Sequence, residues 1–200
     1  MPLARNQPPP LLLVLLLLLL RLSGAFVPRQ PLPATPVVNN HRLLTTLRGG
    51  ASNTELPPPG APKANYRLVH RDGDLLYLSG HLPARMDGSL ITGKLGGSDG
   101  GLSVEEGYEA ARWAALNLAS SIKEELGGDL SRVVKVVKLF GIVQSSDSFH
   151  EQHLVCNGAS DAFSEIFGSS IGGEHARSAI GTNSLPLDVA VEVEAIVRVR

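Results

Sequence analysis

Apolar and polar residues alternate most regularly at the C-terminal end of the chain. Every second position there is a small apolar residue: Val189, Val191, Val193, Ala195, Val197 and Val199. Glu192, Glu194 and Arg198 lie between them. Successive side chains of a strand point to opposite faces of a sheet, so this pattern predicts a strand with one buried face and one polar face.

A different spacing, typical of an amphipathic helix, begins after Ser103. Apolar residues recur every three or four positions from Val104 to Leu126, and Gly127-Gly128 follows as a stop signal. The start, Ser103-Val-Glu-Glu106, is a capping box, in which the serine hydroxyl and the glutamate carboxylate each bind a free backbone N–H of the first turn.

A second helix is predicted to begin near Asp147 or Ser148 and to end before Gly168. It would bury Val155, Ala159, Ala162, Phe163 and Ile166. Short apolar or β-branched runs between turn residues predict further strands. They are Tyr66–His70 and Leu75–Ser79 across the turn Asp72-Gly-Asp74, Leu90–Leu95, Val133–Val143, and a stretch that ends at Leu185-Pro186.

This order of strands and helices predicts an α+β domain in which two helices cover one face of a sheet. No internal repeat is present in the sequence. A sheet that is covered on one side only leaves its second face in need of a partner, and oligomerisation would supply one.

The first 25 residues are predicted to be a signal peptide. Ten Leu and Val residues at 11–20 follow Arg5 and precede Arg21-Leu-Ser-Gly-Ala25. Ten apolar residues are too few to span a bilayer, which takes about 20. A basic start, a short apolar run and small residues behind it are typical of a secretory signal. We therefore expect no membrane attachment of the mature protein.

Residues 26–53 are predicted to be a transit peptide or a disordered segment. They begin with Phe26, contain arginines and hydroxyl residues, and include no acid. A signal peptide followed by phenylalanine and such a segment resembles the two-part presequences of secondary plastids, so we expect a plastid location, with secretion as the alternative. The proline-rich residues 54–64 are predicted to be a stiff linker, and residues 65–200 the folded domain.

The charge of the chain is unevenly distributed. Five of the 18 basic residues and none of the 19 acidic residues lie before Glu55, so the remainder carries 13 basic and 19 acidic side chains, a net charge of −6. Electrostatic capture of nucleic acid is therefore disfavoured. Cys156 is the single cysteine, which excludes an intrachain disulfide and any multi-cysteine zinc site. We expect neither a metal nor a cofactor.

The residues with the clearest chemical potential are Arg177 and the strand acids Glu192 and Glu194. Arg177 has two interpretations: a solvated surface residue, or a planar fork that binds a substrate carboxylate through two hydrogen bonds. The two acids are equally consistent with a solvent-exposed outer face of the strand. If Arg177 and Glu192 face one cleft, the first can hold an anion while the second orients or deprotonates a water.

The domain resembles the RidA/YjgF family of enamine and imine deaminases, also known as liver perchloric-acid-soluble protein endoribonucleases. The resemblance covers residues 65–200 and depends on the following segments: Leu78-Ser-Gly-His-Leu-Pro83, Val134-Lys-Val-Val-Lys-Leu139, Asn157, Ala176-Arg-Ser178, Leu185-Pro186 and Val191-Glu-Val-Glu-Ala-Ile196. Arginine, then Leu-Pro, then the alternating glutamate strand is the most specific part of the pattern.

The resemblance implies a chorismate-mutase-like fold with a mixed sheet, assembled as a homotrimer around a central barrel, with sites in the clefts between subunits. It implies hydrolysis of 2-imino acids and enamines to 2-keto acids and ammonia without a cofactor. Arg177 would bind the carboxylate and Glu192 would position the water. The other site residues that it implies are Tyr66, Ser79, Asn157 and the backbone around Ala179.

Two features mark the chain as a divergent member. Ala179 stands where family deaminases usually carry cysteine, and Gly172-Gly173 is inserted before Arg177. Two alternatives to the deaminase follow. The trimer could be a non-catalytic module that binds small carboxylates or protects other proteins, or it could be an endoribonuclease, which the net charge disfavours.

Overall fold

The computed structural model describes residues 54–97 and 101–200. The predicted signal peptide and the transit-peptide-like segment lie outside the described residues. Within that part of the chain, no helix combines the length and the apolar character needed to cross a membrane.

A tight hairpin opens the described sheet. Strand β1 (Val69–Asp72) pairs antiparallel with β2 (Leu75–His81), and a two-residue turn connects them. Gly73 adopts φ 60° in that turn, a left-handed conformation that glycine reaches without steric cost. The first strand therefore lies slightly later in the chain than the predicted Tyr66–His70, and the hairpin itself is as predicted.

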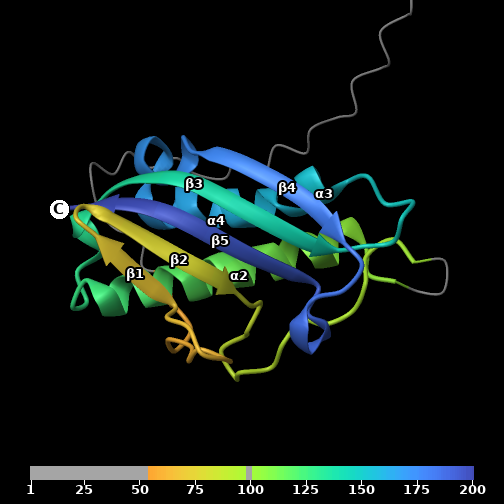
Figure 1. Ribbon diagram of the computed structural model, residues 1–200. Helices are drawn as coiled ribbons and strands as arrows, with labels where there is room; N and C mark the ends of the chain where they lie inside the picture. The colour runs from red at the N-terminus through yellow and green to blue at the C-terminus, as the bar shows by residue number, and fades with distance from the viewer. Residues whose placement is uncertain (1–53, 98–100) are drawn as a thin grey trace, which may run out of the picture. The chain divides into compact units, whose positions relative to one another are not determined.

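Five strands form one mixed sheet in the order β1-β2-β5-β3-β4 (Figure 1). Strands β2 and β3 (Val133–Gln144) both run antiparallel to the central β5 (Val191–Val199). Strand β4 (Ala176–Thr182) is an edge strand and runs parallel to β3. A parallel connection needs a long crossover, which the helices between β3 and β4 provide.

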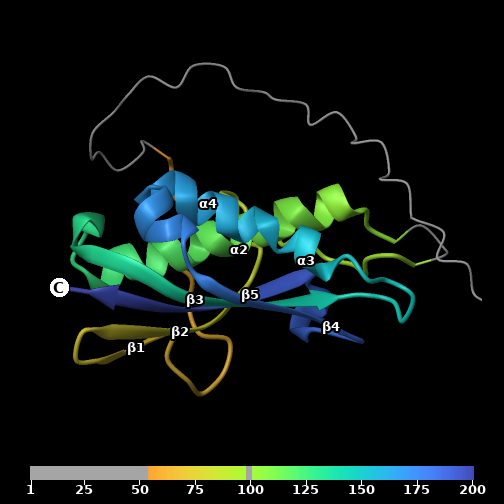
Figure 2. The ribbon, with the colours of Figure 1, turned by 90° about the horizontal axis from the view of Figure 1, so that it is seen from above.

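Helices α2, α3 and α4 lie on one face of the sheet, and within residues 54–97 and 101–200 the other face carries no α-helix (Figure 2). Helix α2 (Val104–Glu125) begins with the predicted capping box: Ser103 Oγ accepts from Glu106 N at 3.2 Å, and Glu106 Oε2 accepts from Ser103 N at 2.8 Å. The crossover contains α3 (Gln152–Val155) and α4 (Asn157–Phe167). The predicted α+β architecture is confirmed.

The core lies between this helical layer and the alternating apolar side chains of the sheet. The residues of β5 that point into it are those of the predicted apolar set from Val191 onward, and each is at most 3% exposed. The residues between them point to the open face of the sheet, where Tyr77 of β2 and Ile180 of β4 remain 42% and 46% exposed.

Helices α2 and α4 approach each other closely at Gly158. A Cβ atom at this position would collide with the carbonyl oxygen of Tyr108 in α2. Two polar contacts tie the same pair of helices: Tyr108 Oη donates to Asp161 at 3.0 Å, and Arg112 Nη2 lies 2.6 Å from Glu165 Oε2. Small residues at a crossing let two helix backbones approach, so Gly158 sets the separation of this layer.

Two predicted elements were wrong. Leu90–Leu95 is not a strand, because its residues make only isolated bridges, such as Thr92 with Val189. The second helix does not begin at Asp147 or Ser148. The residues there form a turn, in which Phe149 N donates to Ser146 O and the Ser146 hydroxyl donates to Gly96 O. These hydrogen bonds hold the segment in a non-helical turn, and α3 begins only at Gln152.

The proline-rich segment before the hairpin packs on the domain. Pro57 is buried, its carbonyl oxygen accepts a hydrogen bond from Ser120 Oγ of α2, and Leu56 packs against the core. These contacts make residues 56–59 a cover for one end of α2.

We expect Gly158→Ala to destabilise the domain, because the added methyl group meets the backbone of α2 rather than a flexible side chain. Such overpacking costs about 1–3 kcal/mol. Urea unfolding followed by circular dichroism measures the effect. Gly60→Ala is the matched control, since a Cβ there meets no atom within 4 Å. Equal stability of the two variants would contradict a close helix contact at Gly158.

Candidate active site in two halves

Arg177 projects from β4 to the helical side of the sheet. Its cross-strand neighbour in β3 is Leu139, which is buried in the core. The guanidinium reaches the junction of α3 and α4: Nη1 donates to Asn157 Oδ1 at 3.1 Å and to Ser160 Oγ at 2.8 Å, and Nη2 donates to His153 O at 2.9 Å. Three acceptors from one helical segment therefore hold the orientation of the fork.

The hydroxyl of Ser160 is held in turn by His175. The ring atom Nδ1 lies 2.6 Å from Gly172 O, and Nε2 lies 3.0 Å from Ser160 Oγ. A carbonyl oxygen only accepts, so Nδ1 carries the proton and Nε2 accepts from the serine. Burial lowers the pKa of His175, with Arg177 adding to the effect, which favours this neutral tautomer.

Two N–H donors of Arg177 remain for a ligand. A guanidinium has five such donors, and three of those in Arg177 have acceptors among the described residues. The Nε–H and one Nη2–H are left, and Arg177 is partly exposed. Two neighbouring N–H groups match the two oxygens of a carboxylate.

Glu192 lies on the other face of the sheet. Its partner in β3 is Ile142, and its carboxylate lies directly against Gly80, where any Cβ atom would overlap Oε1. The absence of a side chain at Gly80 makes room for the acid. Burial raises the pKa of the Glu192 carboxyl, and the like charge of Glu194 raises it further. A carboxylate with a raised pKa is a better proton acceptor.

The pairing register places Arg177 and Glu192 on opposite faces of one protomer. Leu139 of β3 pairs with both Arg177 of β4 and Ala195 of β5. Arg177 therefore points to the same face of the sheet as Ala195, which is the buried face under the helices. Glu192 is an odd number of residues from Ala195 and so points to the open face. A single protomer does not bring the two side chains together.

The remaining predicted site residues divide in the same way. Asn157 binds Arg177, and Ala179 lies on the same face of β4; these three residues form the arginine half. On the side of β2, Ser79 Oγ donates to Arg67 O at 2.8 Å, and Tyr66 is 42% exposed in a cleft that Gly80 also lines. With Glu192 against Gly80, Glu192, Ser79 and Tyr66 form the glutamate half.

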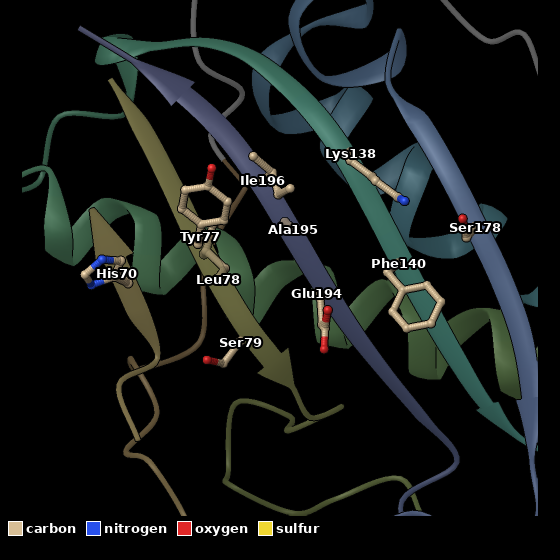
Figure 3. A pocket seen from close by; sticks show the side chains of 10 residues that line it. All are labelled: His70, Tyr77, Leu78, Ser79, Lys138, Phe140, Ser178, Glu194, Ala195 and Ile196. Carbon is tan, nitrogen blue, oxygen red and sulfur yellow. The ribbon is translucent and has the colours of Figure 1, made fainter. Parts of the chain in front are cut away.

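A hollow with a volume of about 520 Å³ lies in the middle of the open face of the sheet (Figure 3). Ser79 from β2, Glu194 from β5 and Phe140 from β3 line it, together with Lys138. Sequence reasoning interpreted Glu194 as part of a wet outer face, and the structure places it in this hollow beside the glutamate half.

Cys156 lies near Ala179, although the two residues come from different parts of the chain. Its sulfur packs against Gly141, which is the cross-strand neighbour of Ala179. Burial raises the pKa of this thiol to about 11, despite the opposing charge of Arg177, so it is protonated at neutral pH. A protonated, buried thiol contributes to core packing and does not act as a nucleophile.

Sequence reasoning missed Ser160 and His175 as partners of Arg177. One signal for Ser160 was present: it follows Asn157 by three positions on a predicted helix, which places both on one face. His175 gave no signal, because the turn Ser169–Gly173 that carries its backbone acceptor is irregular.

Within residues 54–97 and 101–200, no three His, Cys, Asp or Glu side chains gather as a metal site requires.

Comparison with known proteins identifies the family. Residues 47–197 match the family model described as "YjgF/chorismate_mutase-like, putative endoribonuclease". The chain belongs to the RidA/YjgF family. The predicted membership and the predicted chorismate-mutase-like fold are confirmed.

Similar proteins occur in distant organisms. The Trypanosoma cruzi protein TCP17 is 47% identical over 143 residues, which cover 72% of this chain and 86% of TCP17. The crystal structure of Atu1372 from Agrobacterium tumefaciens, a protein of unknown function, has a TM-score of 0.64 at 42% identity, covering 68% of this chain and 85% of that one. The crystal structure of a Shewanella oneidensis protein has a TM-score of 0.66 at 34% identity, covering 72% of this chain and 92% of that one.

We expect Glu192→Gln to stabilise the domain at neutral pH. A carboxyl whose pKa is raised by folding destabilises the native state wherever it is ionised, so the gain is present above the raised pKa. It disappears as the pH falls below the ordinary value of 4.5, where the group is protonated in both states. Thermal unfolding at several pH values measures this, with the exposed Glu55→Gln as the control. A stability gain of Glu192→Gln that persists at acidic pH would contradict a raised pKa of Glu192.

Proposed function

We propose that the protein hydrolyses 2-imino acids to 2-keto acids and ammonia at sites formed between two copies of the chain. The observation that supports this most is the state of Arg177: three acceptors orient its fork, and two N–H donors remain for a carboxylate. A fork that is oriented before the ligand arrives loses less side-chain freedom on binding.

Arg177 binds the carboxylate of the imino acid in this proposal and places the C=N group at a fixed distance from it. The hydrogen-bond network that orients Arg177 extends through Ser160 to His175, so these two residues help to fix the orientation of the guanidinium. The donor set favours a carboxylate, since a planar pair of N–H groups on a cation matches its two oxygens and its charge.

Glu192 accepts a proton from the attacking water. The water oxygen bonds to the imine carbon, the C=N double bond becomes single, and the proton passes through Glu192 to the nitrogen. The hydroxyl proton of the resulting carbinolamine then passes through Glu192 to the amine nitrogen, and ammonia leaves as the C–N bond breaks and the C=O bond forms. Burial and the charge of Glu194 raise the pKa of Glu192, which suits a group that accepts and returns a proton.

The two halves meet between neighbouring copies in this proposal. They lie on opposite faces of one protomer, so a complete site needs the arginine half of one copy and the glutamate half of the next. Members of the family are oligomeric. The edge strand β4, with one unpaired side, and the uncovered sheet face are the surfaces that a homotrimer would use.

We expect the full chain to accelerate ammonia release from 2-imino acids that an amino-acid oxidase generates in the same solution. Arg177→Ala removes the fork and should lower the rate at least about a hundredfold, because substrate positioning is lost. Glu192→Gln should lower kcat while leaving 2-keto acid binding in place. The control is Arg71→Ala, an exposed arginine outside both halves.

No acceleration with several imino acids would overturn the deaminase. If calorimetry then still showed binding of 2-keto acids that depends on Arg177, the protein would be the carboxylate-binding module instead. Equal rates for Arg177→Ala and the wild type would overturn both functions.

Mixing the two inactive variants tests the shared site. In a mixed trimer, an Arg177→Ala copy contributes Glu192 and a Glu192→Gln copy contributes Arg177, so about one of the three sites is intact. We expect co-expression of the variants to restore activity in the purified mixed oligomer. The control is each variant purified alone. A mixed oligomer without activity would contradict a site that is built from two copies.

A further inference from the structure

Strand β2 contains a β-bulge directly opposite the strand acids. Its residues Ser79 and Gly80 both stand opposite Glu194, where a regular ladder would place one residue. The pairs that enclose the bulge are Leu78 with Ala195 and His81 with Val193. Bulges are frequent next to active sites, where they redirect a side chain or end the pairing of a strand. This bulge lies in the glutamate half of the proposed site.

The extra residue turns His81 to the helical side of the sheet. In a regular strand, His81 would lie three positions from the buried Leu78 and would point to the open face. With the bulge it pairs with the buried Val193, and its side chain is 4% exposed. The same bulge contains Gly80, where the Glu192 carboxylate occupies the space that a Cβ atom would take. One irregularity therefore makes room for the acid and sends a histidine into the core.

Both ring nitrogens of His81 have partners. Nδ1 lies 2.7 Å from Ser79 O, and Nε2 lies 2.8 Å from the hydroxyl oxygen of Ser121 in α2. A carbonyl oxygen only accepts, so Nδ1 carries the proton and Nε2 accepts from the serine hydroxyl. Burial lowers the pKa of His81, against the opposing effect of the bond to Ser79, and this favours the neutral ring.

The hydrogen bond from His81 to Ser79 encloses Gly80. It joins the side chain of one neighbour of this glycine to the carbonyl group of the other, and so closes a small ring around it. Glycine is the residue with the greatest backbone freedom, and a closed ring removes much of that freedom. Because the Glu192 carboxylate lies directly against Gly80, the path of the backbone there decides where the carboxylate can lie.

We propose that His81 is a positioning residue for Glu192, which acts by fixing the backbone of Gly80 through Ser79 O. The inference rests on the proposed function, in which Glu192 accepts and returns the proton of the attacking water. His81 touches neither the substrate nor the water in this proposal. Its ring is a buried titratable group that the proposed chemistry otherwise leaves without a role.

A matched pair of variants tests the hydrogen bond. Asparagine and leucine have the same branching and nearly the same size, but only the amide of asparagine can donate to Ser79 O from the place of Nδ1. We expect His81→Leu to lower kcat of imine hydrolysis at least about tenfold, because the proton acceptor is misplaced. His81→Asn should restore most of kcat. The affinity for pyruvate, a 2-keto acid that Arg177 binds in the proposed function, should be unaltered in both variants.

Titration of the Glu192 carboxyl carbon by NMR on the full chain tests the positioning without any reaction, and Glu192→Gln identifies the signal. Burial is the larger cause of the raised pKa of Glu192, ahead of Glu194, so a displaced carboxylate should titrate nearer the ordinary value of 4.5. We expect this fall in His81→Leu and not in His81→Asn. Tyr108→Phe, which removes a hydrogen bond between α2 and α4, is the control and should change neither kcat nor this pKa.

An unchanged kcat and an unchanged pKa of Glu192 in His81→Leu would overturn the positioning role and leave the deaminase in place, even if the variant unfolds more easily. An equal loss in His81→Asn would assign the effect to packing and also overturn it. If the wild type does not hydrolyse imines, the deaminase fails alone, and the pKa of Glu192 in the two variants decides the role of His81. Should His81→Leu not fold, His81→Met replaces it, because its flexible chain fills the space of the ring without a donor.

Discussion

The strict alternation of side chains along β5 is the constraint on which the rest of the structure depends. The valines and alanine on one face bury against α2, and this apolar face determines which way every neighbouring residue in the sheet points. A shift by one residue would expose the whole apolar set, so the register is strongly specified. The same register places Glu192 on the open face and Arg177 on the helical face.

The helical layer has a second role, because it orients the guanidinium. The junction of α3 and α4 supplies His153 O, Asn157 and Ser160 to Arg177, and the Gly158 contact with α2 holds α4 in place. The open face has a different character, because it carries Glu192 and Glu194, a hollow and exposed apolar side chains. In the proposed function, each protomer thus contributes one half of a site from each side of its sheet.

The two mistaken elements show what local sequence leaves open. Leu90–Leu95 has strand-like composition, but no neighbouring strand is available to it, and it pairs only at isolated positions. Asp147–Glu151 has polar residues suited to a helix start, but the Ser146 hydroxyl binds Gly96 O, far away in the sequence. Tertiary hydrogen bonds overrode local propensity in both segments.

The sequence alone determined the elements whose signal is local: the capped helix after Ser103, the alternating C-terminal strand, the hairpin at Gly73 and the family motifs that contain Arg177 and Glu192. Spacing of side chains along one segment carries that information. Only the tertiary structure decided that these two residues lie on opposite faces and that Ser160 and His175 hold the fork. These relations depend on strand order and register between segments far apart in the chain, which no local pattern encodes.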